Sequence, residues 1–305
     1  MSRVIRIGSR DSELALWQAN AVRQQLHNSG VSAEIITVKS EGDLQTDTPL
    51  YELGITGIFT RTLDIAMLNK EVDIAVHSMK DVPTALPKGI VKAAVLKRAN
   101  PHDVLAHKGL DFLNTEGVLA TGSLRRKAQW LHRYPLHEIV DLRGNVPTRL
   151  KKLQEKYWNG AIFAAAGLER LGLLVPKNHT QLSWMIPAPA QGAIMVVALA
   201  SDEFALQALE SLNHKETEIC TGIEREFLRE LEGGCSAPIG ALAQILGTKI
   251  RFKGLLASLD GQQLLRVDDE IEIENYSGIG VAYAQQILVE GGNEILSTIK
   301  TKMGQ

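Results

Sequence analysis

The chain has 305 residues, of which 45% are hydrophobic and 22% charged, and its formal net charge is −2. These values are typical of a globular protein with room for two or three domains. The near-neutral charge argues against general nucleic-acid binding, and the longest apolar runs, AIFAAAGL and AIMVVALA, are too short to span a membrane.

Cysteine usage and the N-terminal sequence indicate the compartment. The chain has 2 cysteines and no C-x-x-C pair, which favours a reducing cytoplasm over a disulfide framework. The opening MSRVIRIGSR lacks the apolar core of a signal peptide. We therefore expect a cytoplasmic protein. No H-E-x-x-H or Cys/His cluster is present, so we expect no metal site.

Strand and helix signals alternate from the start of the chain. The expected elements are a strand at 4–8, a helix at 12–28, a strand at 33–38, a helix at 57–71 and a strand at 72–78. In the first helix, Ala15, Ala19, Val22 and Leu26 share one face, and Gly30 lies just beyond its end. This order predicts an α/β fold with a parallel or mixed sheet covered by helices.

A second α/β unit follows a strand at 91–96 and a crossing segment, KRANPHD. Its expected strands are 118–121, 138–142 and 161–166, and its expected helices are 123–134, 146–156 and 167–172. A second crossing, PAPAQGA, leads into a strand at 193–199 and a helix at 202–213. Two crossings predict a two-lobed body, with ligands bound at the carboxyl ends of the strands.

The last third of the chain has a different character. A helix at 218–231, three strand-like runs between 239 and 273, and a helix at 278–292 predict a small α+β domain. We therefore expect three domains: residues 1–97 with 193–213, residues 98–192, and residues 214–305.

Arginines occur where helices disfavour them. Ser123 is a natural N-cap, which places Arg125 and Arg126 in a first helical turn. Pro147 suits an early helical position, so Arg149 is also in a first turn, with Arg143 just before it. Cations oppose the helix dipole there, and two such helix starts therefore indicate a ligand with several negative charges.

Three further positions bear on this cleft. Arg10 also lies between a strand and a helix, whereas Arg170 fits either the cleft or a solvated helix face. Asp81, in HSMKDVP, follows a strand and could stabilise a developing cation or exchange protons, although for a single such residue an ordinary loop or capping role is the more common one.

The stretch LEGGCSAPIG places Cys235 behind two glycines. Glycines permit close backbone approach, and a thiol is a strong nucleophile. For an isolated cysteine, the more common role is that of a small buried hydrophobe.

Nine stretches together resemble the porphobilinogen deaminase (hydroxymethylbilane synthase) family. In order they are IGSRDSELALWQA, EGDLQTDTPL, DIAVHSMKDVP, TGSLRRKAQ, LRGNVPTRL, AAAGLERLGL, PAPAQGA, LNHKET and LEGGCSAPIG. They run from Ile7 to Gly240, and HSMKD, SLRR, LRGN-x-x-TRL and LEGGC in this order are highly specific.

The resemblance implies two lobes like those of type II periplasmic binding proteins and a third domain with a cofactor loop. It implies a cytoplasmic, monomeric transferase of tetrapyrrole (haem) biosynthesis that deaminates porphobilinogen and adds the units one at a time. Cys235 would hold a dipyrromethane cofactor through a thioether. Asp81 would contact the pyrrole nitrogens, assist proton transfer and stabilise the cationic carbon left by loss of ammonia. The implied cofactor- and substrate-binding residues are Arg10, Ser78, Lys80, Ser123, Arg125, Arg126, Arg143, Arg149, Arg170 and Gln191.

Some positions depart from the family pattern. Glu52 and Thr56 stand where lysines are common in the loop over the cleft, Glu41 replaces a common basic residue, and Gly122 replaces a frequent serine. The altered loop leaves an impaired relative of the synthase open as an alternative. A non-enzymatic two-lobed anion-binding protein is a second alternative, because its fold would look much the same. Cys220 matches no motif, and we expect it to be a buried core residue on the helix that precedes the cysteine loop.

Overall fold

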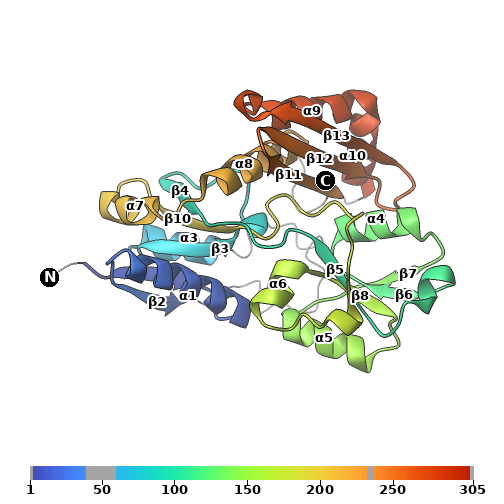
Figure 1. Ribbon diagram of the computed structural model, residues 1–305, viewed down its shortest axis with the longest axis horizontal. Coiled ribbons are helices and arrows are strands. Elements are labelled where there is room, and N and C mark those ends of the chain that lie inside the picture. The colour runs from blue at the N-terminus through green and yellow to red at the C-terminus, as the bar shows by residue number, and fades with distance from the viewer. Residues whose placement is uncertain (1–2, 39–59, 232–236, 303–305) are drawn as a thin grey trace. The chain divides into compact units, whose positions relative to one another are not determined.

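The computed structural model describes residues 3–38, 60–231 and 237–302 (Figure 1). These residues form two compact units, the first from residues 3–38, 60–99 and 192–218 and the second from the remainder. Within the described ranges, no helix combines the length and the apolar character needed to cross a membrane. The boundaries of the three expected domains stay a prediction.

A five-stranded mixed sheet forms the centre of the first unit. Its order is β2-β1-β3-β10-β4, with β1 (Ile5–Ser9), β2 (Ala33–Thr37), β3 (Ile74–Ser78), β4 (Ile90–Val95) and β10 (Ile194–Leu199). β1 pairs in parallel with β2 and β3. β10 comes from much later in the chain and pairs antiparallel with β3 and β4. The expected α/β class is confirmed.

The helices of the first unit follow the local signals. They are α1 (Glu13–Asn28), α3 (Arg61–Leu68) and α7 (Glu203–Glu210). α1 begins because the hydroxyl of Ser12 accepts the N–H of Ala15 at 3.4 Å. Its buried face joins a core with residues of β1, β3 and β10. α3 is shorter than the expected helix at 57–71, whose first three residues lie outside the described ranges.

A second five-stranded sheet lies in the second unit, in the order β7-β6-β8-β5-β9. Its strands are β5 (Asp103–His107), β6 (Val118–Ala120), β7 (Glu138–Val140), β8 (Gly160–Ala164) and β9 (His179–Gln181). The helices beside it are α4 (Leu124–Arg133), α5 (Val146–Glu155) and α6 (Ala165–Arg170). β5 was not expected, because the short apolar run after Asp103 gives no periodic signal and directly follows the crossing segment.

The two five-stranded sheets share one arrangement. In each, three neighbouring strands are parallel, the fourth is antiparallel to them, and the fifth pairs antiparallel with the fourth. The chain order also matches, since β1-α1-β2-α3-β3 corresponds to β6-α4-β7-α5-β8. The loops after β1 and β3 therefore occupy positions equivalent to those after β6 and β8.

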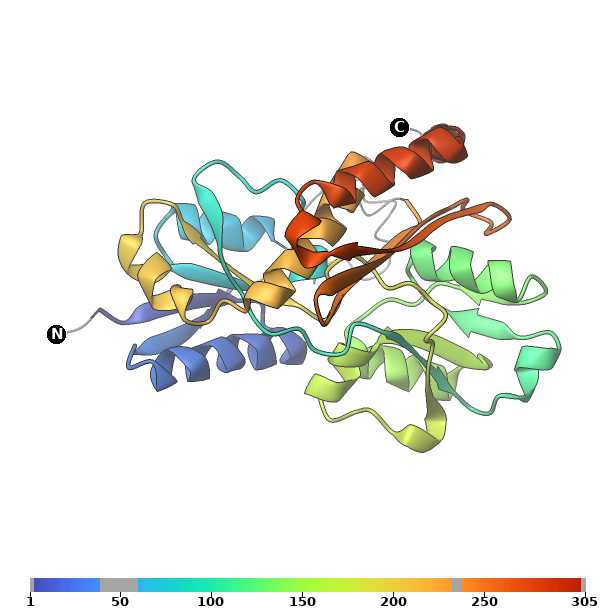
Figure 2. The same ribbon diagram turned by 45° about the horizontal axis from the view of Figure 1, so that its top comes forward.

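The C-terminal part of the second unit contains a three-stranded antiparallel sheet (Figure 2). Its strands are β11 (Ile239–Leu246), β12 (Lys249–Ala257) and β13 (Leu264–Glu272). Its helices are α9 (Ile279–Ile287), α10 (Asn293–Lys302) and α8 (Lys215–Glu230), whose first four residues belong to the first unit. Phe227, Phe252 and Ile287 are fully buried in the core of this part. The expected helix at 278–292 is divided in the structure: α9 ends at Ile287, a π-helical turn covers Leu288–Gly292 with Gly291 at φ 114°, and α10 follows.

Candidate functional site

Ten of the twelve predicted site residues lie at or after the carboxyl ends of parallel strands in the two five-stranded sheets. In the first unit, Arg10 follows β1, whereas Ser78 ends β3 and Lys80 and Asp81 lie just beyond it. In the second unit, Ser123, Arg125 and Arg126 follow β6, Arg143 and Arg149 follow β7, and Arg170 follows β8. This is the edge of a parallel α/β sheet at which ligands bind.

The turn after β3 presents Lys80 and Asp81 outward. Met79 is 1% exposed, and its N–H donates to the carbonyl oxygen of Ala193 at 3.0 Å, which anchors the short 3-10 turn Met79–Asp81. The hydroxyl of Ser78 accepts a hydrogen bond from Nε2 of Gln18 on α1 at 2.8 Å. Lys80 is half-buried and Asp81 is exposed, and the Asp81 carboxylate makes no hydrogen bond or ion pair with the described residues.

A buried histidine lies beside this turn. His77 on β3 is 6% exposed, and its Nε2 has no hydrogen-bond partner among the described residues. Burial, followed by the positive charge of Arg10, lowers the pKa of His77 to about 4. The imidazole is therefore neutral near pH 7, and Arg10 and Lys80 supply the positive charge at these two loops.

The predicted helix start at Ser123 is confirmed. The hydroxyl of Ser123 accepts the N–H of Arg126 at 3.4 Å, so Arg125 and Arg126 occupy the first turn of α4. The preceding Gly122 has a structural reason: a Cβ there would lie 2.8 Å from the carbonyl oxygen of Leu142. A serine at this position would require the loop after β7 to move.

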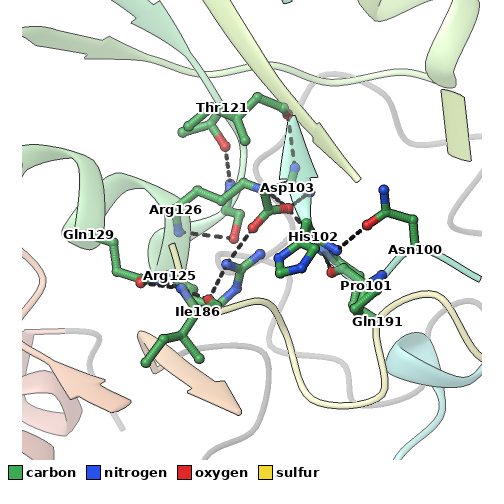
Figure 3. Close-up of polar contacts among 12 residues, drawn as sticks. Asn100, Pro101, His102, Asp103, Thr121, Arg125, Arg126, Gln129, Ile186 and Gln191 are labelled. Atoms are coloured by element: carbon green, nitrogen blue, oxygen red, sulfur yellow. Dashed lines mark hydrogen bonds and ion pairs between the residues drawn. The ribbon is translucent and has the colours of Figure 1, made fainter. Parts of the chain in front are cut away.

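Arg125 and Arg126 are buried against a carboxylate that the sequence did not reveal (Figure 3). Asp103, the first residue of β5, is fully buried. Its Oδ1 accepts from Nε and Nη2 of Arg126 at 3.0 and 2.7 Å, and its Oδ2 accepts from Nη1 of Arg125 at 2.7 Å. The two arginines hold the pKa of Asp103 well below its usual range, although burial opposes them.

Gln191 belongs to the same cluster and is 1% exposed. Its Nε2 donates to Oδ1 of Asp103 at 3.0 Å and to the carbonyl oxygen of Pro101 at 2.8 Å. Gln191 therefore lies next to Asp103, as Figure 3 shows. A role of Gln191 in contacting the ligand stays a prediction.

The loop between β7 and α5 is built for a tight turn. Gly144 has φ 110°, and its carbonyl oxygen accepts from Nε of Arg149 at 2.6 Å. Oδ1 of Asn145 caps α5 by accepting the N–H of Thr148 at 2.9 Å, and Pro147 lies in the first turn, as predicted. Burial lowers the pKa of Arg143 more than the nearby Asp141 raises it.

Arg170 is the last residue of α6 and is half-buried. Burial lowers its pKa to about 10, an effect that outweighs the charge of Glu169. A partly desolvated guanidinium favours an added anion, because the anion restores the stabilisation that water supplied. This setting differs from a fully solvated helix face.

Cys235 lies outside the described residues, and so do Glu41, Glu52 and Thr56. The described flanks of the cysteine segment are fixed: Leu231 is fully buried in the core, and the N–H of Ile239 donates to the carbonyl oxygen of Ala237 at 2.8 Å. Cys220 is a residue of α8 that is 6% exposed and lies in the hydrophobic core of the C-terminal part, as expected.

The donor set suits a ligand that carries carboxylates. Around Asp103, two guanidinium groups share one carboxylate, so this buried cluster has an excess of one positive charge. Further guanidinium groups follow β7 and β8. A dipyrromethane bears acetate and propionate side chains, which pair well with guanidinium forks. Among the described residues, no group of three His, Cys, Asp or Glu side chains is arranged to hold a metal ion.

Comparisons with known proteins agree with this donor set. Residues 5–207 match the family described as porphobilinogen deaminase, dipyromethane cofactor binding domain. Residues 218–289 match the porphobilinogen deaminase C-terminal domain.

Curated relatives cover nearly the whole chain. The porphobilinogen deaminase of Desulforamulus reducens is 41% identical over 308 residues, covering 98% of this chain and 99% of that protein. The porphobilinogen deaminase of Nostoc sp. is 40% identical over 311 residues, covering 97% and 95%. Among solved structures, the methionine binding protein MetQ is 11% identical with a TM-score of 0.44, covering 68% of this chain and 89% of that one. A periplasmic substrate-binding protein from Coxiella burnetii is 14% identical with a TM-score of 0.43, covering 72% and 96%. Because the family model matches residues 5–207 and relatives about 40% identical cover nearly the whole chain, the chain belongs to the porphobilinogen deaminase family.

Proposed function

We propose that this protein is a hydroxymethylbilane synthase, a transferase of tetrapyrrole biosynthesis. It deaminates porphobilinogen and joins the units head to tail into the linear tetrapyrrole hydroxymethylbilane. The observation that carries this proposal is the match to the family's cofactor-binding domain over residues 5–207, the range that contains the arginines at the strand ends. The cofactor is a dipyrromethane, held covalently by Cys235.

The arginines bind and orient the acidic side chains of the pyrroles. Each pyrrole unit carries an acetate and a propionate, so the lengthening product is a polyanion. Arg10, Arg143, Arg149 and Arg170 are half-buried, a setting in which a charge-assisted hydrogen bond to a carboxylate is stronger than in water. Ser78 and Lys80 add donors at the carboxyl end of β3, and Ser123 adds one after β6.

Asp81 is the catalytic carboxylate of this proposal. When bound, the dipyrromethane supplies the nucleophilic pyrrole carbon to which the first substrate unit is added. Loss of ammonia from porphobilinogen leaves a cationic carbon, and an uncommitted carboxylate can stabilise that charge. Asp81 has this character because it is exposed at the carboxyl end of β3 and forms no ion pair with the described residues.

A monomeric state and a cytoplasmic location are further parts of the proposal. The first follows from the resemblance to the family, and the second also from the cysteine usage of the chain. Analytical ultracentrifugation of the purified protein tests the oligomeric state. A stable dimer at micromolar concentration would contradict it.

The intact mass of the purified protein tests the anchor. The wild type is expected to carry a mass excess of two linked pyrrole units, mapped by peptide analysis to Cys235. Cys235→Ser removes the thiol and is expected to show the bare chain mass. Cys220→Ser is the matched control, because Cys220 is the other cysteine of the chain, and it keeps the excess.

The alternatives predict different masses and rates. A bare wild-type mass that persists after incubation with porphobilinogen would favour the non-enzymatic anion-binding protein. A loaded wild type without turnover would indicate the impaired relative. A fully loaded Cys235→Ser variant would show that the anchor is wrong.

Substitution of Asp81 separates loading from turnover. Asp81→Asn is expected to retain the mass excess while kcat falls about 10²-fold or more, because the charge that stabilises the cation is lost. Asp111→Asn, which changes another exposed carboxylate on a short 3-10 helix, is expected to leave kcat unchanged. Steady-state rates with porphobilinogen measure both, and a near wild-type kcat for Asp81→Asn would remove Asp81 from the mechanism.

A further inference from the structure

We propose that Asp103 is a positioning residue that orients Arg125 toward an acidic group of the pyrrole ligand, while Arg126 holds Asp103 in place. This inference rests on the proposed function and assigns different tasks to two adjacent arginines that resemblance treats alike. It also gives a role to a carboxylate that no sequence motif singles out.

Asp103 is held from several sides inside the second unit. Its two oxygens accept four hydrogen bonds: two from Arg126, one from Arg125 and one from Gln191. The side chain has no exposed surface. A carboxylate this fully engaged is a fixed point from which a neighbouring guanidinium can be aimed.

Arg126 is committed to the protein interior. Its Nε and Nη2 donate to Asp103, and its Nη1 donates to the carbonyl oxygen of Ile162 on β8 at 2.9 Å. Each of its three guanidinium nitrogens therefore already has a protein partner. Arg126 consequently serves to neutralise and fix Asp103.

Arg125 keeps unused donors. Its Nη1 donates both to Oδ2 of Asp103 and to the carbonyl oxygen of Ile186 at 2.8 Å. Among the described residues, no hydrogen bond is formed by its Nε or Nη2. Asp103 and Ile186 thus hold Nη1 of Arg125 in place, and its Nε and Nη2 can donate to a carboxylate of the ligand.

Charge alone and positioning predict opposite effects for Asp103→Asn. If Asp103 only reduced the local positive charge, its removal would leave two uncompensated guanidinium groups, and an anion would bind more tightly. If Asp103 positions Arg125, its removal lets the guanidinium turn, and an anion binds more weakly. The sign of the change therefore distinguishes the two roles.

The experiment measures the Kd of porphobilinogen by calorimetry, together with KM and kcat. Asp103→Asn is expected to raise Kd and KM about tenfold or more, the effect of losing one charge-assisted hydrogen bond, with a smaller change in kcat. Arg125→Gln is expected to raise Kd similarly. The double variant is expected to be no worse than either single one, because both remove the same interaction.

Asp73→Asn is the matched control. Asp73 is 5% exposed and accepts hydrogen bonds from Arg3 and Arg6, so it is another buried carboxylate shared by two arginines. It lies next to the start of β3, away from the carboxyl end that carries the site residues. Asp73→Asn is expected to lower Tm but to leave Kd and KM at wild-type values.

A decrease or no change in Kd for Asp103→Asn, or additive effects in the double variant, would overturn the proposal. If Asp103→Asn does not fold, lysine substitutions decide. Arg125→Lys is expected to raise Kd with Tm nearly unchanged, whereas Arg126→Lys is expected to lower Tm more than it raises Kd. The reverse pattern refutes the assignment.

Failure of the proposed function gives a different result. A wild type that binds porphobilinogen without turnover would refute the synthase activity, while the Kd values would still decide the role of Asp103. A wild type that neither binds nor turns over porphobilinogen would overturn both.

Discussion

Arg125 and Arg126 show how a cation can be tolerated in the first turn of a helix. The helix dipole disfavours each of them there by about 0.3–1 kcal/mol. Asp103 offsets this cost, because its carboxylate lies within 2.7 Å of both guanidinium groups. The partner of a helix-start arginine can thus be a buried protein carboxylate as well as a bound anion, and here one carboxylate serves two cations.

His77 makes stability depend on pH. Its pKa is about 4 in the folded protein, against 6.5 for an ordinary histidine. Between these values the unfolded chain binds more protons, so the free energy of unfolding falls as the pH is lowered from about 6.5 to about 4. One such group contributes about 1.4 kcal/mol per pH unit across this window and no further loss below it.

Urea unfolding at several pH values between 7 and 4.5 measures this effect. His77→Gln is expected to make the dependence shallower by about one proton. His27→Gln, which changes an exposed histidine of α1, should behave as the wild type. An unchanged slope in His77→Gln would refute the contribution of His77.

At the scale of elements, the β12–β13 hairpin packs its turn onto α4. The carbonyl oxygen of Gly261 accepts from Nδ1 of His132 at 2.8 Å, and Ala128 packs against Leu255 and Ala257. A Cβ at Gly261 would meet the carbonyl oxygen of Ala128 and lie 2.9 Å from the backbone nitrogen of His132. Glycine is thus required for the close approach of this hairpin to the helix that carries Arg125.

Alanine substitutions in the two hairpin turns separate backbone strain from this docking. Gly247 has φ 65° and open space around it, so Gly247→Ala costs about 1–2 kcal/mol for the left-handed conformation alone. Gly261 has φ 74°, and Gly261→Ala adds about 1–3 kcal/mol for overpacking against α4. Chemical denaturation measures both, and equal losses would show that the contact with α4 contributes nothing.

At the scale of the whole molecule, Glu224 links three parts of the second unit. This residue of α8 is fully buried, and its two carboxylate oxygens accept the N–H of Ala190 at 2.6 Å and of Ala243 at 2.7 Å. Ala190 lies in the crossing segment PAPAQGA, after β9, and Ala243 lies on β11. One carboxylate therefore joins the helix, the crossing segment and the three-stranded sheet.

Glu224→Gln is expected to destabilise the second unit by about 2–4 kcal/mol, because charge-assisted hydrogen bonds to buried backbone amides are lost. Hydrogen exchange should accelerate in β11 and β12, while β1 and β3 of the first unit keep their protection. Glu216→Gln, an exposed change on the same helix, is the control. Equal acceleration in both units would show that they unfold as one.

Local signals in the sequence predicted most elements and the position of the candidate site. Ser12, Ser123 and Pro147 mark helix starts that the structure confirms, because capping depends on residues within one turn of each other. Strand–helix alternation placed Arg10, Asp81 and most of the other predicted residues after strand ends, because the periodic pattern of each element is also local. The family motifs lie in these same short segments, and the function was predicted from them.

Tertiary structure alone decided how the arginines are used. Asp103 meets Arg125 across 22 positions of sequence and Gln191 across 88, and no periodic or motif signal connects residues so far apart. The pairing arises because β5 inserts between β8 and β9, which buries the start of β5 beneath the first turn of α4. A charge inside a low-dielectric interior must be matched by whatever group the packing brings near, and that is a property of the folded chain rather than of any local stretch of sequence.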